Sequence, residues 1–333
     1  MSKTPKVVLQ PRDKNIFLDL CKYKGLPMNC LSAKYFEGKQ KICHLRLRKL
    51  EKAGYISKIY HVKTQSQKSL LQGPSRITIY YANYLAQKAI NYNLDSVRAE
   101  RLKPLKNHLE KHILLGELDA NIPNLTPSTE SRIRYSIENN IPLIASIQSD
   151  KLITVSAFNK EDAEKNRPYN NMKSFLREKR INAGNQAVIF VIIAPTFPSS
   201  FLTYNTYYLP WQQADQILTN LAKNTDYYKH SFLKVFMNKG YSLTTRDGLY
   251  WQITKNGKTY NIAELITGST ELMRSLRSPP PNAYIYTLSR SHLYDINLEH
   301  GSFLIYSWKD QTTYQVTPSG DKHHFDKLMK GVI

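Results

Sequence analysis

The stretch Gly38-Lys-Gln-Lys-Ile-Cys-His-Leu-Arg-Leu-Arg-Lys-Leu-Glu-Lys-Ala-Gly54 combines helical periodicity, a helix stop signal and dense positive charge. At 100° per residue, apolar and small side chains share one side of a helix over residues 39–53: Ile42, Cys43, Leu47, Leu50 and Ala53. The opposite side carries Lys41, His44, Arg48 and Lys52. Leu45 falls at the edge of this basic side, and Arg46 falls near the apolar stripe. We expect the apolar side to pack and the basic side to meet an anion.

The neighbouring sequence predicts two more helices and a hairpin. Pro11 can open a helix that ends at Lys24-Gly25, and Asn29 can cap a second one that ends at Glu37-Gly38. Gly54 suits a helix C-cap, and the alternating residues 55–63 and 76–82 predict two strands. Three short helices followed by a basic hairpin predict a winged helix-turn-helix over residues 1–95.

Charge separates the first third of the chain from the rest. The 333 residues carry a formal net charge of +21, and residues 1–115 hold 23 Lys and Arg against 7 Asp and Glu, whereas residues 116–333 hold 24 against 19. Such an excess favours a polyanionic partner, because contacts to phosphates release condensed counterions. An ordinary amphipathic surface helix with solvated cations remains the alternative for residues 39–53.

A resemblance supports the same interpretation. Leu9-Gln-Pro-Arg-Asp-Lys-Asn-Ile-Phe-Leu18 and Leu45-Arg-Leu-Arg-Lys-Leu-Glu-Lys-Ala-Gly-Tyr-Ile56 resemble the winged-helix module of the replication-relaxation family, proteins of plasmids and integrative elements linked to replication and conjugative mobilisation. The resemblance covers only the first ninety or so residues and implies binding to double-stranded DNA. Members often carry a downstream nuclease-like region with an acidic signature. The nearest arrangement in this chain, Asp247 with Gln252 and Lys255, lacks the second carboxylate.

These observations predict a set of DNA-binding residues. The side chains expected near base edges or at the start of the helix are Lys39, Gln40, Lys41, His44 and Arg48. The side chains expected at phosphates or in a minor groove are Lys52, Lys58, Lys63, Lys68 and Arg76. A solvated loop is the alternative for residues 64–75, which include Lys68.

Beyond residue 95 we expect a basic helical connector over residues 96–125 and then a larger mixed α+β domain over residues 126–333. Expected strands lie at 143–147, 152–156, 187–193, 202–208, 249–254, 284–288 and 303–308, and expected helices near 170–180, 211–223, 227–238, 263–276 and 322–330. The continuous apolar run 187–193 is typical of a central strand that is covered on both faces. The predicted fold class is therefore α+β, with an N-terminal winged helix-turn-helix.

No recognisable catalytic motif accompanies this fold. The chain has no phosphate-binding loop and no nucleophile elbow, and neither Tyr227-Tyr228-Lys229 nor His323-His324 matches the tyrosine and histidine pattern of a relaxase. Three cysteines without a Cys-x-x-Cys pattern, Cys21, Cys30 and Cys43, indicate buried thiols rather than disulfides or a metal site. We therefore favour a non-enzymatic protein without cofactor or metal.

The expected role is sequence-specific binding of double-stranded DNA in plasmid replication or conjugative mobilisation. The larger domain would mediate a homodimer or dock replication or relaxosome proteins. No apolar run is long enough for a membrane span, and Met-Ser-Lys-Thr-Pro-Lys at the start leads into polar sequence rather than a signal-peptide core, so we expect a cytoplasmic, DNA-associated protein. Two alternatives stay open: a metal-dependent nuclease or relaxase with its site in the larger domain, and a ligand-sensing transcriptional regulator.

Overall fold

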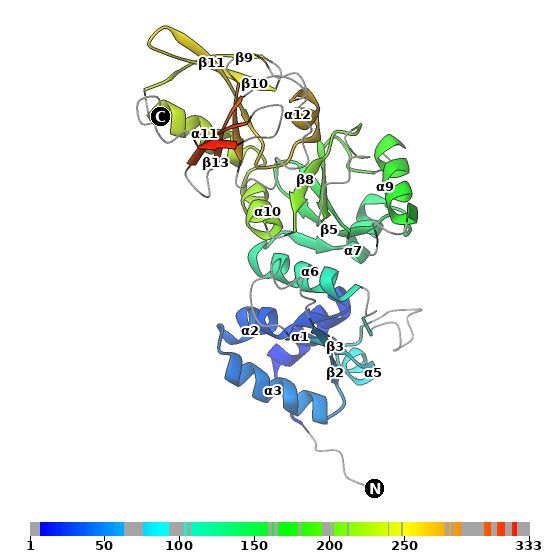
Figure 1. Cartoon of the computed structure of the whole chain (residues 1–333). Coiled ribbons are helices and arrows are strands. Elements are labelled where there is room, and N and C mark those ends of the chain that lie inside the picture. The colour runs from blue at the N-terminus through cyan, green and yellow to red at the C-terminus, as the bar shows by residue number, and fades with distance from the viewer. Residues whose placement is uncertain are drawn as a thin grey trace. The chain divides into compact units, whose positions relative to one another are not determined.

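The computed structural model describes most of the chain as helices and strands, in two compact units (Figure 1). The described residues are 7–62, 76–92, 103–104, 108–158, 162, 166–178, 181–194, 201, 203–211, 213–238, 240–247, 249–276, 280, 283–287, 303–307, 312–316 and 322–324. Unit 1 comprises residues 1–139 and 143–146, and unit 2 comprises residues 140–142 and 147–333. The expected mixed α+β class is confirmed, with helices concentrated at the N-terminus. The change of unit comes near residue 140, later in the chain than the expected boundary near residue 125.

Unit 1 begins with three helices and a small antiparallel sheet in the strand order β1-β3-β2. Its elements are α1 (Pro11–Tyr23), β1 (Leu26–Pro27), α2 (Met28–Phe36), α3 (Gln40–Lys52), β2 (Ile56–Val62), β3 (Arg76–Ala82), α5 (Tyr84–Ala89), α6 (Leu109–Asn121), β4 (Leu125–Pro127) and α7 (Ser128–Tyr135). The helices and hairpin expected from the sequence are therefore present. The tip of the hairpin, residues 63–75, lies outside the described residues.

Local signals explain where α1 and α2 begin and end. Pro11 occupies the first turn of α1, and Lys24 and Glu37 end α1 and α2 in the left-handed conformation, at φ 57° and 54°. The expected N-cap at Asn29 is wrong, because α2 already starts at Met28, directly after Pro27. Pro27 is extended and pairs with Ile79 in the sheet, so the helix starts as soon as the strand ends.

The expected connector contains a helix that belongs to the core of unit 1. Leu109 and Ile113 of α6 are buried in one cluster with Ile79 of β3. Gly116 allows α6 to pack closely against the start of α2, since a Cβ atom at this position would lie 2.8 Å from Pro27 Cδ and 3.2 Å from Cys30 Sγ. Residues 96–102 and 105–107 of the expected connector lie outside the described part of the chain.

Unit 2 contains a group of parallel strands with helices between them. The elements are β6 (Leu152–Ala157), α9 (Asn166–Glu178), β7 (Val188–Ala194), β8 (Tyr207–Pro210), α10 (Ala214–Lys223) and α11 (Tyr227–Asn238). Strand β5 (Leu143–Gln148) precedes them; its first four residues belong to unit 1 and its last two to unit 2. β7 lies between β6 and β8 and is parallel to both, and its residues from Phe190 onward are buried. The central strand expected at residues 187–193 is thus confirmed.

The rest of unit 2 is a seven-stranded mixed sheet in the order β15-β14-β13-β12-β11-β10-β9. Its elements are β9 (Ser242–Asp247), β10 (Tyr250–Lys255), β11 (Lys258–Glu264), α12 (Thr270–Ser275), β12 (Ala283–Thr287), β13 (Phe303–Ser307), β14 (Thr312–Val316) and β15 (Lys322–His324). The helix expected at 263–276 is confined to α12. The helix expected at 322–330 is wrong where it can be checked, because residues 322–324 form β15 through antiparallel pairing with β14. No helix among the described residues is long and apolar enough to cross a membrane.

Candidate nucleic-acid interface

Helix α3 is fixed to unit 1 by its apolar side. Cys43, Leu47 and Leu50 are fully buried, and Ala53 directly after the helix is nearly so. The expectation that Ile42 shares this packed side is wrong, since Ile42 is 52% exposed. The buried stripe is narrower than the sequence pattern predicts, and both Ile42 and Leu45 stand outside it. All three cysteines are buried and free, as the sequence indicates.

The opposite side of α3 is a cationic face, which we define as Lys41, His44, Arg48, Lys49 and Lys52. All five side chains are exposed, and Gln40 at the start of the helix is exposed too. None of the five forms an ion pair with another residue that the structure describes. The sequence prediction included these positions except Lys49, which extends the face toward Ile42. The four Lys and Arg side chains within three helical turns form a concentrated positive surface.

Elsewhere in unit 1, several cations have acidic partners. Lys22 lies 3.0 Å from Glu130, Lys58 lies 3.0 Å from Glu51, and Lys39 lies 2.6 Å from Glu37. Two residues predicted to bind DNA, Lys39 and Lys58, therefore already form an ion pair with a carboxylate. The Lys39 pair is well exposed and costs little to open, whereas each side chain of the Lys58 pair is less than a third exposed.

The hairpin beside α3 presents one further predicted residue. The Arg76 guanidinium lies over the ring of Tyr60, 3.6 Å from its centroid, and Tyr60 is 42% exposed. This contact is a cation–π pair that holds the arginine against β2 while leaving its edge accessible. Lys63 and Lys68 lie outside the described residues.

Arg46 attaches α3 to the start of α1. Its Nε donates a hydrogen bond to Asp13 Oδ1 at 3.0 Å, its Nη2 donates to Asp13 Oδ2, and Nη2 also donates to the Val8 carbonyl at 2.9 Å. Asp13 is fully buried and also accepts the backbone N–H of Gln10 at 2.7 Å. A bidentate pair of this kind fixes both position and orientation. The pair therefore fixes the orientation of α3 relative to α1.

A second ion cluster ties α6 to the first two helices. Lys34 Nζ donates to Asp19 Oδ2 and to Asp119 Oδ2, each at 2.7 Å, while the hydroxyls of Tyr23 and Tyr35 donate to Asp119 and Asp19. Burial and these hydrogen bonds raise the pKa of both tyrosines. Burial lowers the pKa of Lys34, but the hydrogen bonds to the two aspartates outweigh it and the net pKa is raised. One ammonium bridges two carboxylates that also accept the tyrosine hydroxyls, so we interpret the cluster as a structural clamp.

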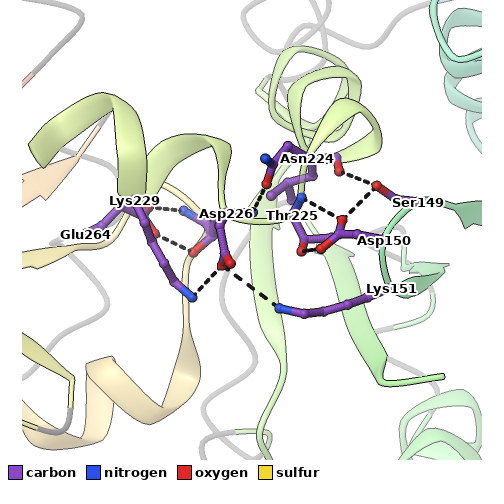
Figure 2. Close-up of polar contacts among 10 residues, drawn as sticks. Ser149, Asp150, Lys151, Asn224, Thr225, Asp226, Lys229 and Glu264 are labelled. Carbon is purple, nitrogen blue, oxygen red and sulfur yellow. Dashed lines mark hydrogen bonds and ion pairs between the residues drawn. The ribbon is translucent and has the colours of Figure 1, made fainter. Parts of the chain in front are cut away.

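Unit 2 contains a comparable polar brace, drawn in Figure 2. Asp150 accepts hydrogen bonds from Thr225 N at 3.0 Å and Thr225 Oγ1 at 2.6 Å, which join the loop before β6 to the turn between α10 and α11. Desolvation raises the pKa of Asp150, but these hydrogen bonds outweigh it and lower the pKa to about 2. Asp226 lies 2.8 Å from Lys229 Nζ and 3.9 Å from Lys151 Nζ. The polar groups of the brace pair with one another and fix the loop before β6.

Glu264 is a buried carboxyl at the end of β11 (Figure 2). Its Oε1 accepts the Thr267 N–H at 2.7 Å and its Oε2 accepts Thr267 Oγ1 at 3.0 Å. Burial raises the pKa of Glu264 to about 7, against the opposing effect of the Thr267 hydrogen bonds and the charge of Lys229. The folded protein therefore holds a proton on this carboxyl more tightly than an exposed glutamate would.

Two of the residues weighed for catalysis, Tyr228 and Lys229, lie in structural settings. Tyr228 is fully buried, and the Asn220 side-chain amide donates to its hydroxyl at 2.9 Å, while its neighbour Lys229 pairs with Asp226. Among the residues that the structure describes, no group of three or more His, Cys, Asp or Glu side chains could hold a metal ion.

No family model, curated protein or solved structure matches the chain.

Proposed function

We propose that unit 1 binds double-stranded DNA with the cationic face of α3 in the major groove. The observation that carries this proposal is that Lys41, His44, Arg48, Lys49 and Lys52 are exposed without acidic partners among the described residues, while Lys22, Lys34, Arg46 and Lys58 of the same unit are paired. Unpaired cations on one side of a helix suit the phosphates and guanine edges along a major groove.

The way α3 is held supports the same function. A helix that reads bases must be rigid, and α3 is fixed both by buried Cys43, Leu47 and Leu50 and by the Arg46–Asp13 pair. The order of three helices and a β-hairpin agrees with a winged helix-turn-helix, in which the third helix enters the groove. In that arrangement Arg76 would reach a phosphate from the hairpin.

The test removes two charges from the cationic face of the full-length protein. In the Arg48→Ala/Lys52→Ala variant we expect the affinity for duplex DNA at low salt to fall at least about tenfold, with a salt slope shallower by roughly 0.9 for each lost phosphate contact. The matched control is Arg134→Ala/Lys223→Ala, which removes the same charge from exposed positions on α7 and α10.

Fluorescence anisotropy with a labelled duplex at several salt concentrations measures both variants. Equal losses in the two variants would mean that net charge alone attracts the DNA, and the proposed interface would be wrong. Absence of any duplex binding by the wild-type chain at low salt would remove the function itself.

The biological setting that we propose is replication or mobilisation of a plasmid or integrative element. It rests on the resemblance of residues 9–18 and 45–56 to replication-relaxation proteins. Overlapping duplexes tiled across the DNA around the coding sequence test it, since a replication or transfer protein should prefer one tile. Uniform binding to all tiles, unrelated DNA included, would contradict this setting.

A further inference from the structure

An exposed leucine lies beside the cations of the cationic face of α3. Leu45 is 52% exposed, in the middle of a helix whose other side is fully buried. Residues three, four and seven positions apart are neighbours on a helical surface. Within α3, four of the side chains at these spacings from Leu45 are cations of the cationic face, Lys41, Arg48, Lys49 and Lys52, and the fifth is the exposed Ile42.

An apolar protein partner does not fit this surrounding. Covering Leu45 with another protein surface would also desolvate the flanking lysines and Arg48, which is costly unless each charge finds a partner. A DNA major groove supplies both environments at once. Phosphates line its edges, where cations bind, and the C5-methyl group of thymine projects into it as an apolar contact for a side chain such as leucine.

We propose that Leu45 is a specificity-determining residue that contacts the C5-methyl group of a thymine in the bound site. The inference rests on the proposed DNA binding by α3 and adds the base that the helix reads. Ile42 has the same 52% exposure but lies one step around the helix toward Arg46, which is paired with Asp13. It therefore serves as a matched aliphatic control.

The experiment begins with the full-length protein and a random pool of duplexes, from which bound sequences are selected at low salt. Each thymine of the preferred site is then replaced singly by deoxyuridine, which removes only the methyl group. For the wild type we expect one or two replacements to weaken binding about three- to fivefold, as expected for one buried methyl group. Leu45→Ala should bind the thymine and uracil duplexes equally, whereas Ile42→Ala should keep the wild-type difference.

Each outcome bears on a different claim. If no uracil replacement weakens wild-type binding, or if the preferred site has no thymine, the inference is overturned while DNA binding by α3 stands. The same holds if Leu45→Ala retains the uracil effect or if Ile42→Ala loses it as well. If the wild-type protein selects no duplex at all, the proposed function and this inference fall together.

Discussion

Arg46 in the middle of α3 and Asp13 in the first turn of α1 form a bidentate, buried ion pair across 33 positions of sequence. Asp13 is fully buried, and the Arg46 side chain is 14% exposed. The pair therefore acts on two levels. It stabilises the packing of unit 1, and it orients the helix that carries the cationic face.

We predict that Asp13→Asn destabilises unit 1 by about 3 kcal/mol, because removal of one partner leaves the other charge buried without compensation. The asparagine can still accept the Gln10 N–H, so the start of α1 is kept. Urea unfolding followed by far-UV circular dichroism measures the loss. Tryptophan fluorescence reports on unit 2 alone, since Trp211, Trp251 and Trp308 all belong to it.

The control for Asp13→Asn is Glu37→Gln, which removes the acid of the exposed Lys39–Glu37 pair. An exposed pair of this kind contributes about 0–1 kcal/mol. Similar losses in the two variants would show that the buried pair contributes no more than an exposed one. A change in the tryptophan transition of either variant would show that the effect is not confined to unit 1.

The Lys34 clamp predicts that unit 1 loses stability in alkali. The ordinary pKa is 10.0 for Tyr23 and Tyr35 and 10.5 for Lys34, and all three are raised in the folded protein. The folded state therefore holds these protons more tightly than the unfolded state. The stabilisation is fully present below about pH 10 and is lost as the pH rises further, so melting temperatures should fall from about pH 10 upward.

Removing the two hydroxyls tests which groups cause this loss. Tyr23→Phe/Tyr35→Phe should show a shallower decline above pH 10 than the wild type, whereas Tyr84→Phe, at a 62% exposed position, should keep the full decline. Thermal melts followed by circular dichroism across this pH range measure the slopes. Identical slopes in all three proteins would refute the role of the clamp.

The sequence predicts much of the fold because many of its signals are local. The helix over residues 227–238 matches α11, and the continuous apolar run matches β7, since length and periodicity suffice for such elements. The sequence does not predict strand β11, because residues 258–264 are exposed at one end and buried at the other and do not alternate. The partner strand, not the local pattern, determines β15.

The candidate site, too, is only partly predictable from local sequence patterns. Helical spacing places Lys41, His44, Arg48 and Lys52 on one side, and the structure leaves all four exposed. Spacing does not give the width of the buried stripe, so Ile42 was assigned to the wrong side. Nor does it identify distant partners, so the pairing of Arg46 with Asp13 could be found only in the folded chain.

Glu264 predicts a pH dependence of unit 2. Its pKa rises from 4.5 to about 7 on folding, so the folded state binds the proton more tightly. The resulting stabilisation is full below about pH 4.5 and is lost as the pH rises through about 7. Glu264→Gln should remove this decline, because the amide stays neutral and can still pair with Thr267. Urea unfolding followed by tryptophan fluorescence from pH 4.5 to 8 measures it.

The control for Glu264→Gln is Glu271→Gln, an exposed position on α12 in the same unit. This variant should keep the wild-type decline between pH 4.5 and 7. If Glu264→Gln follows the wild-type profile, another group is responsible for whatever pH dependence unit 2 shows.

Glu51 is the only acidic residue of α3, and it predicts a gain in DNA affinity when neutralised. Its carboxylate lies 3.0 Å from Lys58 Nζ and competes with a phosphate for that cation. Glu51→Gln should raise duplex affinity at low salt about three- to tenfold and steepen the salt slope by up to roughly 0.9, the contribution of one further phosphate contact.

The control is Glu130→Gln, which frees Lys22 from a pair with the same 3.0 Å separation but away from α3, and should leave affinity nearly unchanged. Anisotropy titrations of both variants decide the matter, because an equal gain from Glu130→Gln would mean that overall charge, rather than the pairing of a cation beside α3, sets the affinity.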